Sequence, residues 1–155
     1  MHRVWIAFIA LTIVALTIPA MAAGDLTRQK PITVSVSLGT NDGAMAFVPN
    51  ELTFETGKLY KLVLFNPSDV KHYFTSKTLA SKVFTRKVQV IHNGERLAEI
   101  KGTISEIEVF PGGTSEWWFV PVSTGTFSDL HCHVKSDDGK TTHADMGMVG
   151  TITIK

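Results

Sequence analysis

The fold is decided by two neighbouring segments, Leu130-His131-Cys132-His133 and, after residues 134–142, His143-Ala144-Asp145-Met146-Gly147-Met148-Val149-Gly150. These segments hold the only cysteine, three of the six histidines and two of the five methionines. A thiolate, an imidazole and a thioether on one loop between two strands are donors for a mononuclear copper site, which needs two His and one Cys in a trigonal set and a weak axial Met. The loop supplies three of these donors, and His72 is the best candidate for the fourth.

Two further patterns carry a family resemblance. The C-terminal pattern is His143-x-x-x-Gly147-Met148-Val149-Gly150-x-Ile152-x-Ile154, and the earlier one is Phe47-x-Pro49-x-x-Leu52-x-Phe54-x-x-Gly57-x-x-Tyr60-x-Leu62-x-x-x-Asn66. Together they resemble the ligand loop, last strand and early strands of cupredoxins, the plastocyanin/azurin-like type 1 blue copper proteins. The likeness covers Ile32 to Lys155, with a divergent middle. It implies an all-β Greek-key β-sandwich (the cupredoxin fold) with a short helix-containing insertion.

The resemblance also implies one type 1 copper ion per chain, held by His72, Cys132, His143 and Met148. In cupredoxins the first His ligand follows soon after a strand that ends in Asn, and His72 follows Asn66 in this way. His143 and Met148 are five positions apart, as in plastocyanin-like loops, whereas Cys132 and His143 are eleven apart, more than in the small members. Met146 is the rival of Met148 for the axial position.

The two histidines that flank Cys132 admit a different interpretation. In a strand, the side chains of His131 and His133 point to the face opposite Cys132. They either bind a second, weaker metal ion or are surface or inter-sheet residues. His131-Cys132-His133 also resembles multicopper oxidases, whose trinuclear cluster needs further His-x-His pairs that the surroundings of His72 and His92 do not offer. With no nucleophile–base constellation in the sequence, we expect no enzyme activity.

The N-terminus has the pattern of a secretory signal peptide. Met1-His2-Arg3 is basic, Val4 to Ile18 is apolar, and Ala20-x-Ala22 is a small-residue cleavage pattern. We expect residues 1–22 to be a signal peptide and residues 23–155 to be one cupredoxin domain in the periplasm. The alternative is an uncleaved membrane anchor, for which the run is short, since a spanning helix needs about 20 residues.

The net charge and the cysteine content limit the classes of function that this chain can have. The 15 Lys+Arg less Arg3 leave 14, against 14 Asp+Glu, so the mature chain is near neutral and shows no basic patch for nucleic acid. A single cysteine in an exported protein cannot form an internal disulfide, and metal ligation gives it a role. We expect electron transfer with redox partners such as a c-type cytochrome or a copper oxidase. The alternatives are a copper carrier or resistance protein without redox cycling, and a detached sensory or assembly domain.

Alternation of apolar and polar residues predicts short strands separated by turns. The residues from Ser76 to Phe84 predict about two turns of helix with Leu79, Val83 and Phe84 facing inward. His92-Asn93-Gly94-Glu95 predicts a hairpin turn. Trp117 and Trp118 must point to opposite faces of their strand. The predicted strands or extended segments are 32–38, 47–54, 58–65, 86–91, 104–109, 114–120 and 125–132.

Overall fold

The computed structural model describes residues 24–155; the predicted signal peptide, residues 1–22, lies outside the described residues. The described part contains eleven strands, one α-helix and one short 3₁₀ helix, η1 (Leu26–Arg28). The other elements are β1 (Ile32–Leu38), β2 (Phe47–Val48), β3 (Glu51–Phe54), β4 (Tyr60–Phe65), β5 (His72–Thr75), α1 (Lys77–Lys82), β6 (Val83–His92), β7 (Glu95–Ile100), β8 (Glu106–Val109), β9 (Thr114–Pro121), β10 (Gly125–His131) and β11 (Val149–Ile154).

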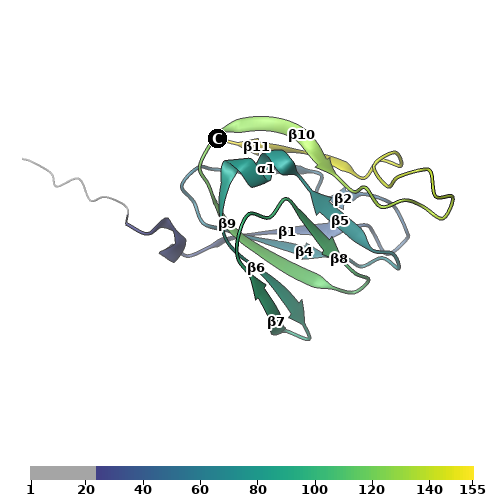
Figure 1. Ribbon diagram of the computed structural model, residues 1–155, viewed down its shortest axis with the longest axis horizontal. Helices are drawn as coiled ribbons and strands as arrows, with labels where there is room; N and C mark the ends of the chain where they lie inside the picture. Colours follow the sequence, from purple (N-terminus) through teal and green to yellow (C-terminus); the bar gives the residue numbers. More distant parts are fainter. Residues whose placement is uncertain (1–23) are drawn as a thin grey trace, which may run out of the picture.

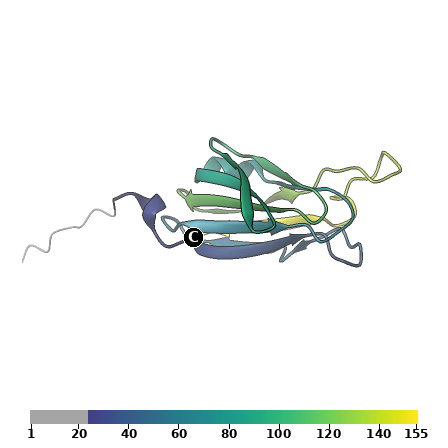
Figure 2. The same cartoon turned by 90° about the horizontal axis from the view of Figure 1, so that it is seen from below.

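The strands form two packed sheets, as Figure 2 shows from the edge. The six-stranded sheet has the order β2-β1-β4-β9-β6-β7, and the five-stranded sheet has the order β3-β11-β10-β5-β8. Most neighbours are antiparallel, but β1 pairs in parallel with β4, and β11 pairs in parallel with β3. The predicted all-β sandwich of the cupredoxin type is confirmed.

Period-two alternation builds the core between the sheets. In β4 the residues Tyr60, Leu62 and Leu64 are buried, whereas the residues between them are only partly covered. Trp117 and Phe119 on β9 point into the same space, with ring centres 5.2 Å apart. Cys132 and Met148 belong to this same buried cluster. The donors of the predicted copper site therefore lie at the margin of the core.

The insertion after β5 differs in one respect from its prediction. Helix α1 begins after Ser76, whose hydroxyl oxygen caps the Leu79 amide at 3.1 Å, and Leu79 is buried as predicted. The inward position predicted for Phe84 is wrong, because the chain becomes extended at Val83 and Phe84 is 56% exposed. The change from a helical to a strand period at Val83 moves Phe84 to the outer face.

The two ends of the sandwich differ. The yellow-green loop between β10 and β11 projects from one end, and η1 and the C-terminus lie at the other (Figure 1). Trp117 is fully buried, and Trp118 on the outer face is covered by Lys87, whose ammonium lies 4.8 Å from its ring centre, which agrees with the predicted division. No helix within residues 24–155 is long and apolar enough to cross a membrane.

Candidate metal centre

The loop between β10 and β11 returns His143 to the side of Cys132. The residues between them form a small hairpin, closed by a bridge between Lys135 and Thr142. The Ala144 amide donates to the Cys132 carbonyl at 2.9 Å, and the His143 amide donates to the Val134 carbonyl at 2.8 Å. The extra residues between Cys132 and His143 therefore form a closed hairpin, so the long spacing in sequence does not separate the two side chains in space.

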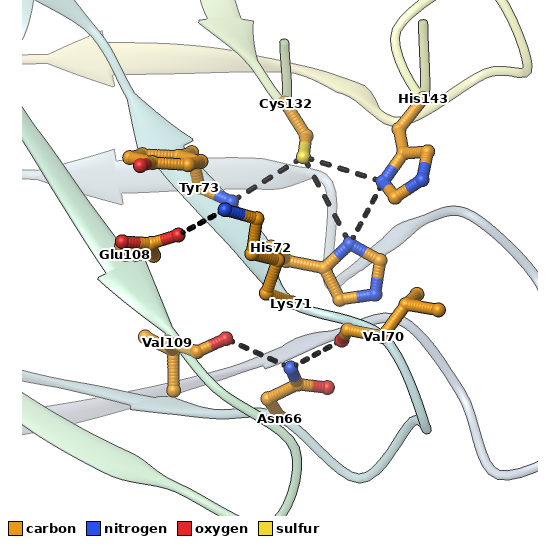
Figure 3. A network of polar contacts seen from close by, with 9 residues as sticks. All are labelled: Asn66, Val70, Lys71, His72, Tyr73, Glu108, Val109, Cys132 and His143. Atoms are coloured by element: carbon orange, nitrogen blue, oxygen red, sulfur yellow. Dashed lines mark hydrogen bonds and ion pairs between the residues drawn. The ribbon is translucent and has the colours of Figure 1, made fainter. Parts of the chain in front are cut away.

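Three buried donor atoms meet at this end of the sandwich (Figure 3). His72 at the start of β5, Cys132 after β10 and His143 on the loop place their donor atoms within 4.8 Å of one another. The two Nδ1 atoms lie 3.1 Å apart, and Cys132 Sγ lies 3.8 Å from His72 Nδ1 and 3.5 Å from His143 Nδ1. The structure thus brings together three of the four predicted ligands.

These separations fit a trigonal metal site. An ion that lies about 2.0 Å from each nitrogen and about 2.3 Å from the sulfur, with angles at the ion of roughly 100° to 115°, places the two nitrogens about 3.1 Å apart. It places each nitrogen about 3.7 Å from the sulfur. The measured distances match this geometry within a few tenths of an ångström. Two imidazoles and one thiolate are also the donor types of a type 1 copper site. The residues present therefore fit copper in both chemistry and spacing.

Burial separates the two candidates for the axial thioether. Met148 is fully buried in the cluster that contains Cys132, and its amide donates to the His143 carbonyl at 2.9 Å. Met146 is 50% exposed, and its sulfur accepts a hydrogen bond from the Ser136 hydroxyl at 3.1 Å. Met148 is thus the methionine whose side chain shares the interior with the three donors.

His72 is oriented by a polar network that sequence reasoning missed. Its Nε2 lies 2.9 Å from the Ser68 hydroxyl, which in turn lies 2.8 Å from Asn66 Oδ1. With Nδ1 facing Cys132 and His143, Nε2 carries the proton and donates it to Ser68, which fixes the tautomer that a metal requires. The signal in the sequence was Asn66-Pro67-Ser68, a turn whose side chains bond to nearby backbone.

Burial also governs the protonation of the donors. It raises the pKa of the Cys132 thiol, while hydrogen bonds from the Tyr73 and Val134 amides act in the opposite direction. Burial lowers the pKa of His143, and burial with the nearby His143 charge lowers the pKa of His72 to about 4. Both imidazoles are therefore neutral at pH 7 and ready to ligate, and a bound cation is needed to hold Cys132 as thiolate.

The depressed pKa of His72 predicts a pH-dependent stability for the metal-free protein. Between pH 6.5 and 4 the unfolded chain binds a proton at His72 and the folded chain does not. The free energy of unfolding is therefore highest above pH 6.5 and decreases as the pH falls through this range. The expected loss is on the order of 3 kcal/mol. Urea unfolding at several pH values measures it. His72→Gln should flatten the profile in this window, and His92→Gln, at an exposed position, should not; equal profiles for the parent and His72→Gln would contradict the assignment.

The two sheets form a β-sandwich of the cupredoxin type, and the buried set of two imidazoles and one thiolate fits a type 1 copper site. The sequence is 24% identical over 123 residues to plastocyanin from Cucumis sativus, covering 78% of this chain and 99% of that protein. No family model matches the chain.

One solved structure supports the fold, and two others superpose less closely. A multicopper oxidase from Campylobacter jejuni, a metallo-oxidase, superposes with a TM-score of 0.53 at 18% identity, covering 82% of this chain and 31% of that one. Auracyanin B superposes with a TM-score of 0.47 at 15% identity, covering 82% of this chain and 91% of that one. For dithionite-reduced auracyanin from Roseiflexus castenholzii the values are 0.45 and 15%, with 79% and 96% covered.

Proposed function

We propose that this chain carries single electrons between redox partner proteins, using one type 1 copper ion held by His72, Cys132, His143 and Met148. The observation that carries the proposal is the meeting of the two Nδ1 atoms and the Cys132 sulfur at 3.1 to 3.8 Å in a buried site. When bound there, copper supplies the redox couple. Backbone hydrogen bonds tie Cys132, His143 and Met148 together, so little rearrangement of the donors should accompany a change of charge.

The location and partners form a second part of the proposal. The basic start, apolar run and Ala20-x-Ala22 pattern support export to the periplasm, and the single buried Cys132 suits an oxidising compartment when a metal protects it. The partners are redox proteins, such as a c-type cytochrome or a copper oxidase. Intact mass of the native protein tests the export step, since cleavage after Ala22 removes 22 residues and an anchor retains Met1.

The electron port is His143 on the projecting loop. His143 is only 2% exposed and lies in a hollow whose apolar lining includes Met45, Val70, Val134 and Met146. Val70 is 41% exposed and Met146 is 50% exposed, so they form the exposed apolar part of a rim around the imidazole that Lys71, Lys135 and Asp137 complete. A partner that covers this rim removes water from the path and comes close to the ligand, whereas the copper itself remains enclosed.

Replacing Met146 with lysine should slow electron exchange with a redox partner by about tenfold, because an unpaired charge at a desolvated rim costs about 1.4 kcal/mol or more in the docked complex. The visible spectrum should stay unchanged, since Met146 is not one of the proposed ligands and its sulfur accepts a hydrogen bond from Ser136. Stopped-flow oxidation by a soluble c-type cytochrome measures the rate, with Met146→Leu as the apolar control. Equal rates for the lysine and leucine variants would place the port elsewhere.

Repeated oxidation and reduction separates electron transfer from copper carriage. We expect the copper-loaded protein to pass through several cycles in voltammetry with one stable potential and no loss of metal. A carrier that holds copper in one oxidation state would release the ion or fail to cycle. Copper content measured before and after cycling therefore decides between the proposed function and the carrier alternative.

A further inference from the structure

Strand β10 contains one extra residue shortly before Cys132. Phe127 lies opposite Ile152 and Leu130 lies opposite Gly150, so three steps along β10 match two steps along β11, which defines a β-bulge. Phe127 packs against the core, and both Leu130 and Cys132 are fully buried. Strict alternation from Phe127 would instead turn Leu130 and Cys132 outward. The bulge therefore decides which face of the sheet the Cys132 thiol occupies.

Asp129 lies within this bulge and is bound to the start of α1. Its Oδ1 accepts a hydrogen bond from the Ser76 hydroxyl at 2.7 Å, and its Oδ2 accepts from the Thr78 amide at 2.8 Å. Ser76 is fully buried, and its hydroxyl oxygen also accepts from the Leu79 amide at 3.1 Å, which limits its rotation. Burial acts to raise the pKa of Asp129, but the hydrogen bonds outweigh burial and hold the pKa below its ordinary value. The carboxylate is therefore charged at pH 7, and its bonds are of the stronger, charge-assisted kind.

The same carboxylate joins the two strands that deliver His72 and Cys132. β5 pairs with β8 along its whole length, but it pairs with β10 through a single residue pair, Thr75 with His131. The Asp129 carboxylate binds the residues that follow Thr75, so it extends this short ladder by side-chain hydrogen bonds. Asp129 thus supplies a connection between β5 and β10 that the backbone pairing leaves incomplete.

We propose that Asp129 is a positioning residue of the metal centre. By holding the bulge of β10 against the start of α1, it keeps the Cys132 thiol inward and maintains the 3.8 Å separation between Cys132 Sγ and His72 Nδ1. Asp129 precedes Cys132 by three positions and touches none of the donor atoms, so it acts through the course of the strand. This role toward a metal rests on the copper site proposed above, whereas the inward position of the thiol holds with or without copper.

Thiol reactivity of the metal-free protein tests the positioning directly. Cys132 is the only cysteine and is fully buried, so the rate of its reaction with an aromatic disulfide reagent reports opening of the structure around it. Asp129→Ala should raise this rate by about tenfold, because a local opening equilibrium then loses a buried, charge-assisted hydrogen bond. Asp129→Asn keeps one side-chain oxygen as an acceptor and should restore most of the protection.

Tyr60→Phe is the matched control for general stability. The Tyr60 hydroxyl accepts from the Glu55 amide at 2.9 Å, so phenylalanine deprives a backbone amide of its partner, as Asp129→Ala does at Thr78. Tyr60 lies on β4, outside β5 and β10, and the thiol rate should therefore rise far less. Equal rates in Asp129→Ala and the parent, or equal increases in Asp129→Ala and Tyr60→Phe, would overturn the proposal.

The copper-loaded protein provides a second readout. We expect Asp129→Ala to bind Cu²⁺ about tenfold more weakly than the parent and to shift the thiolate-to-copper band and the EPR hyperfine splitting. Asp129→Asn should lie close to the parent, and Tyr60→Phe should be unchanged. An unshifted spectrum in Asp129→Ala would contradict the positioning role. If the parent itself shows no such band, the proposed function fails, and the thiol rates alone decide whether Asp129 positions Cys132.

Discussion

Asn66→Ala should lower the free energy of unfolding by about 3–5 kcal/mol, because it leaves several buried polar groups without partners. Asn66 is fully buried, and its amide nitrogen donates to the Val70 and Val109 carbonyls at 2.8 and 2.9 Å (Figure 3). Its carbonyl oxygen accepts from the Ser68 amide at 3.0 Å and from the Ser68 hydroxyl at 2.8 Å. Alanine removes all four bonds at once.

Urea unfolding of the metal-free protein measures this effect. Asn50→Ala is the matched control, because Asn50 is exposed and its contact with the Thr151 amide, at 2.8 Å, is made by a backbone carbonyl that alanine keeps. The control should stay within about 0.5 kcal/mol of the parent. A loss below about 1 kcal/mol in Asn66→Ala would show that the network contributes little to holding the turn before His72.

Gly39→Ala should both destabilise the protein and disturb the metal centre. Gly39 has a φ of +76°, and a Cβ at this position would lie 2.7 Å from His72 Nε2 and 3.1 Å from Ser68 Cβ. The backbone conformation costs a residue with a side chain about 1–2 kcal/mol, and crowding adds about 1–3 kcal/mol. The clash falls on the atoms that orient His72, so copper affinity should fall and the visible band should shift.

Gly43→Ala separates the two contributions. Gly43 lies in the same loop with a φ of +86°, yet a Cβ there meets nothing within 4 Å. It should therefore show the backbone cost alone, about 1–2 kcal/mol, with an unchanged visible band. If both variants had the same spectrum and stability, close packing of Gly39 against His72 would not matter for the site.

The strands and donor residues were predictable because each depends on local sequence. Alternation along β4 places every second residue in the core, and the same holds for the second half of β1 and the first part of β9, whereas Ile32 at the start of β1 is exposed. The donors were found by residue type, since Cys132 is the only cysteine and His143 and Met148 follow it on one loop. His72, Cys132 and His143 meet as predicted.

Other features depend on contacts between distant segments, which sequence patterns do not encode. Asn66 bonds to the Val109 carbonyl, 43 residues away, and the Tyr73 amide donates to Cys132 Sγ, 59 residues away, at 3.3 Å. The position of His133, whose Nδ1 lies 4.0 Å from Glu106 Oε2, likewise depends on how β5 and β8 pair. Phe84 was misplaced because the helix period was extended past the point where the strand begins.

The most direct test of the copper centre is a visible and EPR spectrum of the mature protein after addition of Cu²⁺, recorded beside Cys132→Ala. We predict a strong thiolate-to-copper band in the parent, with one copper per chain, and loss of that band in the variant. Copper bound without such a band, with spectra identical in the parent and the variant, would contradict the type 1 site and move the metal to histidines such as His131 and His133.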